Sequence, residues 1–192
     1  MTELRQLTDF EQILIGLIVG SPRSGYDLKR FFATTPAIVY EPSSGTLYPA
    51  LQRLEKRGLL SSELGVSAGK REQRRYLPTD AGYEAHLRWL RQPVDPVTIG
   101  RDLGTHLMRF VMAEGQLTAT ETLIYLRSLG QALDAFVADM EVFLRDIPRS
   151  GRHPPLAIEH GLAVHRASSK WVREAIIALM KDGSSLPRWI GK

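Results

Sequence analysis

A dense basic cluster and a group of hydroxyl side chains are the residues of this sequence best suited to bind an anion. Residues 70–75, KREQRR, carry four positive charges and one negative charge. Guanidinium and ammonium groups pair with phosphate oxygens, and such pairs dominate the affinity of proteins for nucleic acids. Hydroxyl groups can donate to phosphates and to base edges. The hydroxyl groups precede the cluster, on Ser43, Ser44, Thr46 and Tyr48.

Three predicted helices would position these hydroxyl groups. Thr8 and Glu11 have the spacing of a capping box, which predicts that the first helix begins there. Ser24 can cap the second helix. The third helix is indicated by apolar residues spaced by four and three, which are Leu47, Leu51 and Leu54. Pro49 lies inside this pattern, so we expect the regular helix to begin near Thr46 or to bend at its start.

A β-hairpin with a basic flank is predicted after the third helix. Residues 59–64 and 73–78 are short candidate strands, and Thr79 can cap a fourth helix. This order is typical of a winged helix-turn-helix, whose third helix enters the major groove of DNA. The wing cations, which could contact the DNA backbone or the minor groove, are Lys70, Arg71, Arg74 and Arg75. Strand alternation leaves open which of Arg74 and Arg75 faces away from a duplex. A run of charge can also be no more than a solvated surface.

A proline-containing segment divides the chain into two regions. Residues 92–98, QPVDPVT, have no helical periodicity and separate two helical patterns. We therefore expect a winged helix-turn-helix DNA-binding domain at 1–91, a linker at 92–98 and a helical dimerisation domain, with a possible effector-sensing role, at 99–192. The predicted fold class is mainly α, with the hairpin of the wing as its β-structure.

Apolar residues of the second domain repeat with the rhythm of a coiled coil. Thr118 and Glu121 form a further capping box, and the helix that they begin carries apolar residues alternately three and four positions apart. These are Leu126, Leu129, Leu133, Phe136, Met140, Phe143 and Ile147. The last helix keeps this rhythm through Leu162, Val172 and Ile176. The seam can close within one chain or between two. We expect a homodimer, because one winged helix offers a single half-site and two-fold symmetry doubles it.

Composition excludes several classes of protein. With 43% hydrophobic and 24% charged residues among 192, the chain has enough apolar material for packed cores. The lack of cysteine excludes disulfides, zinc ribbons and cysteine nucleophiles. No catalytic motif is present, and His160 and His165 are five positions apart, so they miss the shared helical face that a metal site uses. We therefore predict no catalytic residue, no cofactor, no metal site and no enzymatic activity.

The remaining expectations concern location and one histidine. The chain shows neither a signal-peptide pattern nor a run of about 20 apolar residues, so we expect a cytoplasmic protein with no membrane partner. The formal net charge of +4 permits an anionic partner without requiring one. His165 lies on the apolar row of the last helix. It either hydrogen-bonds within the helix packing or acts as a polar contact for an effector or for the dimer register.

Several short motifs in the first half form a recognisable set. They are IGLI at 15–18, SGYDL at 24–28, SGTLYPAL at 44–51, RLE at 53–55 and GL at 58–59. The set resembles the PadR-type family of bacterial transcriptional regulators over residues 10–90, and the GTLYP run, which accounts for Pro49, is its most specific part. The C-terminal region has a weaker likeness to the longer-tailed branch of the family. The sequence departs from the family pattern at Pro78, where a leucine is usual, and at Arg75, where an aromatic is expected.

The resemblance implies a function for the whole chain. Family members are dimers, and by resemblance this protein is expected to be a repressor that binds a pseudo-palindromic operator in double-stranded DNA. A small-molecule effector of unknown identity would release it, and the DNA-bound protein would be associated with the nucleoid. Tyr26 becomes a further DNA-facing candidate, although it can equally pack at the start of the second helix. The alternative is a winged-helix module for protein interaction, assembled through its coiled coil, against which the four wing cations argue.

Overall fold

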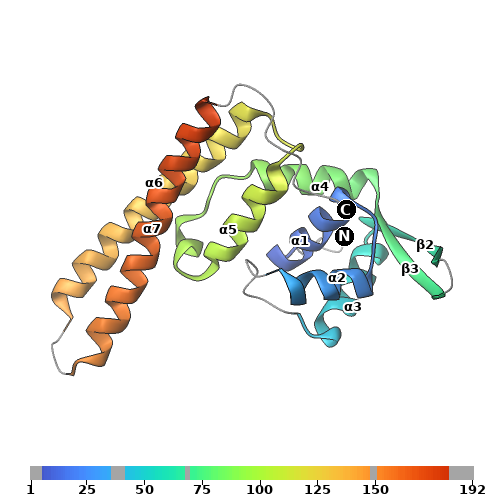
Figure 1. Ribbon diagram of the computed structural model, residues 1–192, viewed down its shortest axis with the longest axis horizontal. Coiled ribbons are helices and arrows are strands. Elements are labelled where there is room, and N and C mark those ends of the chain that lie inside the picture. Colours follow the sequence, from blue (N-terminus) through green and yellow to red (C-terminus); the bar gives the residue numbers. More distant parts are fainter. Residues whose placement is uncertain (1–5, 36–41, 68–69, 148–150, 182–192) are drawn as a thin grey trace, which may run out of the picture. The chain divides into compact units, whose positions relative to one another are not determined.

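The computed structural model is mainly helical, with one small antiparallel sheet, which confirms the predicted fold class (Figure 1). It describes residues 6–35, 42–67, 70–147 and 151–181, and only the backbone within 65–72. The chain forms two compact units. Unit 1 comprises Met1–Leu90 with Leu107–Gln116, and unit 2 comprises Arg91–His106 with Leu117–Lys192.

Unit 1 is a winged helix-turn-helix. Its elements are α1 (Asp9–Gly20), β1 (Arg23–Ser24), α2 (Gly25–Thr34), α3 (Ser44–Lys56), β2 (Leu60–Ser67), β3 (Lys70–Pro78) and α4 (Asp80–Arg91). Local capping sets the helix starts. The Thr8 hydroxyl accepts from the Glu11 amide at 3.2 Å, and the Glu11 carboxylate accepts from the Thr8 amide at 3.1 Å, as predicted. Ser24 forms the same reciprocal pair with Asp27, and Thr79 accepts from the Gly82 amide at 3.1 Å.

The start of α3 differs from its prediction. The helix begins at Ser44 rather than near Thr46, because the Ser43 carbonyl accepts from both the Thr46 and the Leu47 amides at 3.0 Å. Pro49 therefore lies in the second turn, and its missing amide proton leaves the carbonyl of Gly45 without its helical donor. Gly45 is exposed, so water can satisfy that carbonyl. The proline is tolerated because its cost falls on the solvated side of the helix.

The sheet has the order β1-β3-β2, and β1 was not predicted. Arg23 pairs with Tyr76 and Ser24 with Arg75, so β1 is only two residues long and offers no alternation to detect. The fourth helix approaches the start of β2 closely, because a Cβ at Gly82 would stand 1.9 Å from the Leu59 carbonyl oxygen. Only glycine fits this contact between α4 and the hairpin.

The division into units differs from the expected division in one segment. Helix α5 (Ile99–Ala113) has non-helical backbone angles at Asp102, and its second half clusters with unit 1. Arg109 in that half donates to the Leu90 carbonyl at 2.9 Å, and the Met112 sulfur lies 2.6 Å from the position of a Cβ at Gly16. Through these contacts the second half of α5 packs on α1 and α4 of unit 1. The proline-rich segment at 92–98 is therefore a boundary for only part of the polypeptide.

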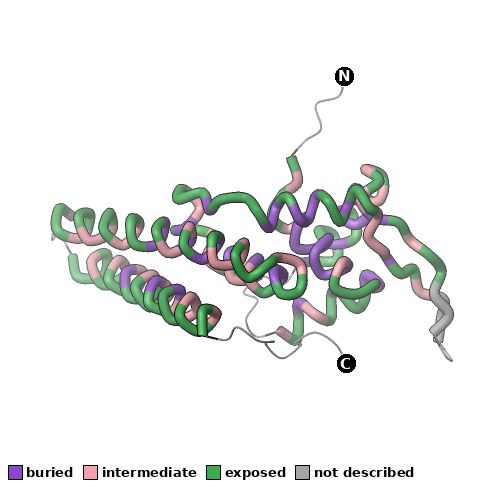
Figure 2. The backbone as a smooth tube through the Cα atoms, turned by 90° about the horizontal axis from the view of Figure 1, so that it is seen from above, coloured by how far each residue is buried: buried purple, intermediate pink, exposed green. Residues whose placement is uncertain are grey.

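Unit 2 is built on a long helical hairpin. It contains η1 (Pro96–Thr98), the first half of α5, α6 (Ala119–Asp146) and α7 (His153–Lys181), and α6 and α7 lie side by side in Figures 1 and 2. The capping box of Thr118 and Glu121 is present as predicted. His165 hydrogen-bonds within the packing, since its Nδ1 lies 2.7 Å from the Gly161 carbonyl oxygen. No helix in the described ranges is both long and apolar enough to cross a lipid bilayer.

The predicted seam closes, in large part, inside one chain. Five of the seam residues are at most 4% exposed within the single chain, and these are Leu126, Leu129, Leu133, Leu162 and Val172. Phe136 packs its ring 4.6 Å from that of His165, whereas Phe143 is 58% exposed. Met140, Ile147 and Ile176 are partly exposed. The five buried residues form the core of the hairpin, so contact with a second chain stays a prediction for the exposed part of the seam.

Candidate nucleic-acid interface

The N-terminal turn of α3 presents its hydroxyl groups to solvent. Ser43, Ser44 and Thr46 are all exposed, and the hydroxyl oxygens of Ser43 and Thr46 lie 3.0 Å apart. Lys29 in α2 donates to the Ser44 hydroxyl at 3.1 Å. Lys29 therefore joins the site as a cation that the sequence interpretation missed. Its signal was an exposed basic side chain on α2, next to the inward-facing Leu28.

Two tyrosines flank this turn. Tyr26 is 60% exposed, so it is not the packed residue of the alternative interpretation, and its contact with DNA stays a prediction. Tyr48 is 40% exposed, and its ring covers Gly25, where an added Cβ would stand 2.5 Å from Cε1 of the tyrosine. The absence of a side chain at Gly25 thus lets the start of α2 pack directly on the aromatic face of α3. Both phenol groups remain able to donate and accept hydrogen bonds.

Helix α3 contacts α1 through a buried carboxylate. Arg53 donates from Nε to Oε1 of Glu11 at 3.1 Å, and the Glu11 side chain is only 2% exposed. Burial raises the pKa of Glu11, but the hydrogen bond from the Thr8 amide and the pairing with Arg53 outweigh it and hold the pKa below its usual value. The carboxylate that caps α1 therefore also positions α3.

The two described wing cations have different surroundings. Register pairs Leu64 with Arg74 and Glu63 with Arg75, so the two arginines point to opposite faces of the hairpin. Arg74 forms an ion pair with Glu55 of α3, with Nη2 at 2.6 Å from Oε2. Arg75 is exposed and makes one weaker contact, from Nη2 to the Pro22 carbonyl at 3.1 Å. The other two predicted wing contacts, Lys70 and Arg71, have side chains that lie outside the described residues.

Acidic groups moderate the positive charge near α2. Burial raises the pKa of Asp27, but the hydrogen bonds from Ser24 lower it by more. The positive charges of Arg23 and Arg75 lower it further, so the pKa is below its usual value overall. Asp27 therefore stays ionised at neutral pH beside Arg75. Among the described candidate side chains, Lys29, Arg75 and the hydroxyls of α3 are exposed, a set suited to positioning a duplex more than to bidentate reading of bases.

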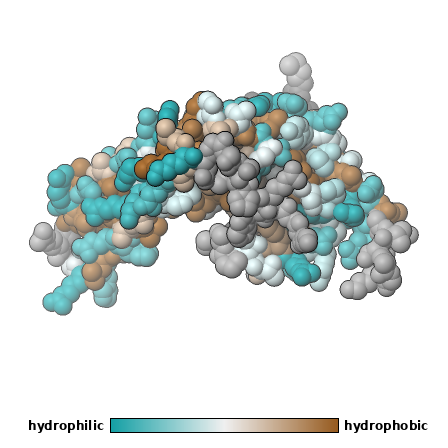
Figure 3. Space-filling view, turned by 45° about the horizontal axis from the view of Figure 1, so that its top comes forward, coloured by the Kyte–Doolittle hydropathy of each residue, from teal (hydrophilic) through white to brown (hydrophobic). Residues whose placement is uncertain are grey.

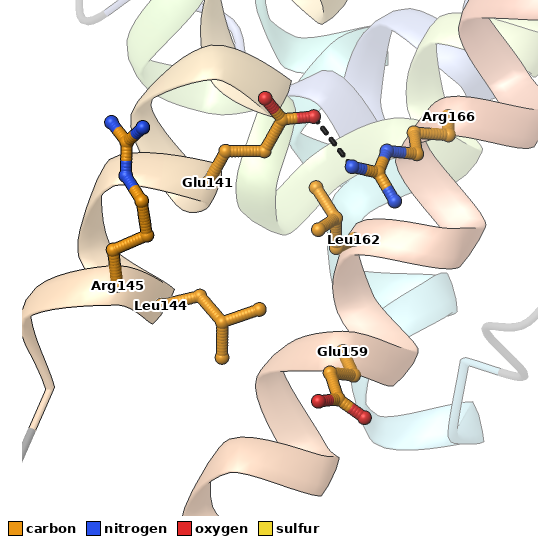
Figure 4. A pocket seen from close by; sticks show the side chains of 6 residues that line it. All are labelled: Glu141, Leu144, Arg145, Glu159, Leu162 and Arg166. Carbon is orange, nitrogen blue, oxygen red and sulfur yellow. Dashed lines mark hydrogen bonds and ion pairs between the residues drawn. The ribbon is translucent and has the colours of Figure 1, made fainter.

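An open hollow lies in unit 2 (Figure 4). It encloses about 490 Å³ between α6 and α7 and is lined by Glu141, Leu144, Arg145, Glu159, Leu162 and Arg166. Glu141 and Arg166 form an ion pair of 2.6 Å, and Arg145 points away from the hollow in Figure 4. With carboxylates and guanidinium groups in equal number, the lining selects neither anions nor cations. Among the described residues, no group of three histidine, cysteine, aspartate or glutamate side chains could hold a metal ion.

The family assignment follows from the region that carries these contacts. Residues 14–87 match the model of the Transcriptional regulator PadR-like family. The winged-helix region belongs to this family. The PadR-like region contains every described DNA-facing candidate, from Tyr26 to Arg75, and its family is one of transcriptional regulators. No curated protein matches the chain.

Solved structures include proteins similar to this chain. Bacillus subtilis PadR in complex with operator DNA is 18% identical, with 90% of this chain and 99% of that chain covered at a TM-score of 0.44. A PadR-like transcriptional regulator from Bacillus cereus is 20% identical, with 92% and 99% covered at a TM-score of 0.42. Bacillus subtilis PadR in complex with p-coumaric acid is 17% identical, with 90% and 99% covered at a TM-score of 0.39.

Proposed function

We propose that this protein is a dimeric, ligand-responsive repressor that binds a pseudo-palindromic operator in double-stranded DNA. One observation carries the proposal. In the PadR-like region, the exposed hydroxyls at the start of α3 lie beside Lys29, and the wing of the same unit carries the exposed Arg75. A helix of this kind enters the major groove, while wing cations contact the flanking backbone.

The chemistry of the surface sets the character of the binding. Ser44 and Thr46 donate and accept single hydrogen bonds, so each tolerates more than one base or phosphate geometry. The cations supply affinity that is independent of base sequence and falls with salt. Selectivity for one operator then rests on two half-sites held at a fixed spacing, which requires two copies of the winged helix.

Exposed apolar side chains on the hairpin of unit 2 support the proposal of a dimer. Seven large apolar side chains on α6 and α7 are between 40% and 63% exposed, and these are Ile124, Val142, Phe143, Leu156, Val164, Ile177 and Met180. Figure 3 shows hydrophobic residues interrupting the hydrophilic surface of the hairpin. Exposed apolar side chains of this size are available to pack against a second chain. Release by a small molecule is implied by the family resemblance alone, and the effector is unknown. Acting on an operator, the protein would work in the cytoplasm, on the nucleoid.

A salt series of DNA binding tests the proposal. Binding of the full chain to the duplex upstream of its own coding sequence is compared with binding to a scrambled duplex, and stoichiometry is read from the same titration. We expect preference for the native duplex, two chains per site and a steep loss of affinity with salt. Arg75→Ala should lower the slope of log affinity against log salt by about 1.8 per two-chain site, because one phosphate contact is lost from each of the two chains.

The matched control is Arg127→Ala, which removes one exposed positive charge from α6. It should leave the slope unchanged, whereas equal effects of the two variants would mean that only net charge matters. The double variant Ser44→Ala/Thr46→Ala should reduce the ratio of affinities for the native and the scrambled duplex without changing the salt slope. A wild-type chain with no DNA affinity at low salt would overturn the proposal and favour a winged helix used for protein contacts.

A further inference from the structure

Three side chains from three elements form a closed ring between the recognition helix and the wing. Glu55 lies near the end of α3, Ser62 in β2 and Arg74 in β3. Arg74 donates from Nη2 to both carboxylate oxygens of Glu55, at 2.7 Å and 2.6 Å, and from Nε to the Ser62 hydroxyl at 2.7 Å. Ser62 in turn donates to Oε1 of Glu55 at 2.6 Å. Each member of the ring contacts the other two.

Within the ring, the donors of Arg74 at Nε and Nη2 are used by Ser62 and Glu55. The single hydroxyl proton of Ser62 goes to Glu55, so its oxygen is oriented to accept from the guanidinium. The Arg74 Cζ also lies 5.6 Å above the ring of Tyr76, a residue only 4% exposed. The Ser62 hydrogen bond, followed by Arg74, lowers the pKa of Glu55 against the opposing effect of burial, so the pair stays ionised at neutral pH. A guanidinium neutralised at this distance attracts phosphate weakly.

Position in the fold gives the ring its role. Along β3 the side chains alternate, so Arg74 and Tyr76 share the face that meets Glu55, while Arg75 lies on the other face. The chain passes from α3 to β2 through Gly58, whose φ of +71° is open to glycine at little cost. This short connection joins the helix and the hairpin at one end, and the ring joins them again at side chains further along both elements.

We propose that Arg74 is a positioning residue, which sets the angle of the wing against the recognition helix through Glu55 and Ser62 and makes no phosphate contact. The inference rests on the proposed DNA-binding function and deepens it. It also divides the wing cations by task, since Arg75 faces a different environment and keeps most of its donors available. Loss of Arg74 would weaken operator binding because the wing would no longer meet the duplex while α3 lies in the groove.

The experiment measures operator affinity across a salt series for Arg74→Gln, Glu55→Gln and the exchange Glu55→Arg/Arg74→Glu, with thermal unfolding of each variant as a check on folding. Each single variant should weaken binding roughly threefold to tenfold, with the same salt slope as the wild type, and the exchange should recover most of the loss. The matched control is the pair Arg166→Gln and Glu141→Gln, an ion pair of equal length in unit 2, which should leave affinity unchanged.

The opposite result is equally distinct. If Arg74 contacts phosphate, Arg74→Gln lowers the salt slope by about 1.8 per two-chain site, and Glu55→Gln strengthens binding because it frees the cation. The exchange would then fail to restore affinity, because it places a carboxylate on the wing. Unchanged affinity in both single variants would also overturn the proposal. Failure of the proposed function is separate, since it appears as absent operator preference in the wild type before any variant is compared.

Discussion

Helices α1 and α7 show how differently the two units bury their residues. Eight of the 12 residues of α1 are buried, in one unbroken run from Glu11 to Ile18. Only three of the 29 residues of α7 are buried, Leu162, Ser169 and Val172. Figure 2 shows buried segments sparse along the hairpin. The winged helix therefore completes its own core, whereas the hairpin has a narrow one.

The contrast teaches where each unit obtains its stability. In unit 1 the surrounding elements enclose α1, including a carboxylate, Glu11, whose burial is offset by the Thr8 amide and Arg53. In unit 2 two helices can bury only the stripe along their line of contact, because each helix turns most of its surface away from the other. The apolar side chains outside that stripe are the feature that a second chain would cover.

The largest expected effects come from single truncations in the two cores. Leu51→Ala in α3 and Leu129→Ala in α6 should each lower the free energy of unfolding by about 2–5 kcal/mol, because both leucines are fully buried. Leu156→Ala, at a 59% exposed site in α7, should change it by no more than about 0.5 kcal/mol. Chemical denaturation measures all three. A Leu129→Ala cost as small as that of Leu156→Ala would mean that the hairpin has no core of its own.

A buried histidine should make the stability of unit 1 depend on pH. His86 is 1% exposed in unit 1, beside Gly16 and Met112, and burial lowers its pKa from 6.5 to about 4. The unfolded chain therefore takes up a proton that the folded chain does not, so stability is full above pH 6.5 and falls as the pH drops towards 4. The loss should be about 3 kcal/mol, measured by denaturation across that range.

Replacement of the histidines checks the assignment of this pH dependence. His86→Gln should remove it, whatever the variant's stability at neutral pH, because glutamine does not titrate. His160→Gln, at an exposed position of α7, should leave the dependence as it is in the wild type. A full pH dependence in the His86→Gln protein would assign the effect to other groups.

The smallest expected effect concerns association through the hairpin. Phe143→Asp places a charge on the exposed apolar face of α6 and should weaken dimerisation at least about tenfold, since burial of a phenylalanine contributes about 1.5–3 kcal/mol. Gln131→Asp adds the same charge at an exposed polar site of α6 and should have little effect. Sedimentation equilibrium measures both. If the Phe143→Asp protein associates as the wild type does, the dimer uses another surface.

Local signals made the helix starts predictable. The capping boxes of Thr8, Ser24 and Thr118 depend on residues three positions apart, so the spacing in the chain is also the spacing in space. The strand β1 gave no such signal, because its two residues are defined only by their pairing with β3. The early start of α3 was missed because the solvent exposure of Gly45, which makes Pro49 tolerable, is a property of the folded unit.

The candidate site was predictable in its residue types but not in their tasks. Sequence interpretation named both Arg74 and Arg75 as candidate DNA contacts and left open which of the two faces away from a duplex. The structure pairs Arg74 with Glu55, 19 positions away, and adds Lys29 through its contact with Ser44. Pairings over such separations depend on which faces of the elements meet, and residue type alone does not specify them.

The sequence by itself determined the order of elements, the helix caps, the winged-helix class and the PadR-like motifs, because each depends on local spacing or on a short run of residues. Tertiary structure decided that Arg74 pairs with Glu55, that the leucine seam closes within the hairpin, and that the second half of α5 joins unit 1 through Arg109 and Met112. The physical reason is the same in each case. The packing of segments that are distant in the chain decides which partner a side chain meets. That packing depends on the free energy of the whole unit and not on local spacing.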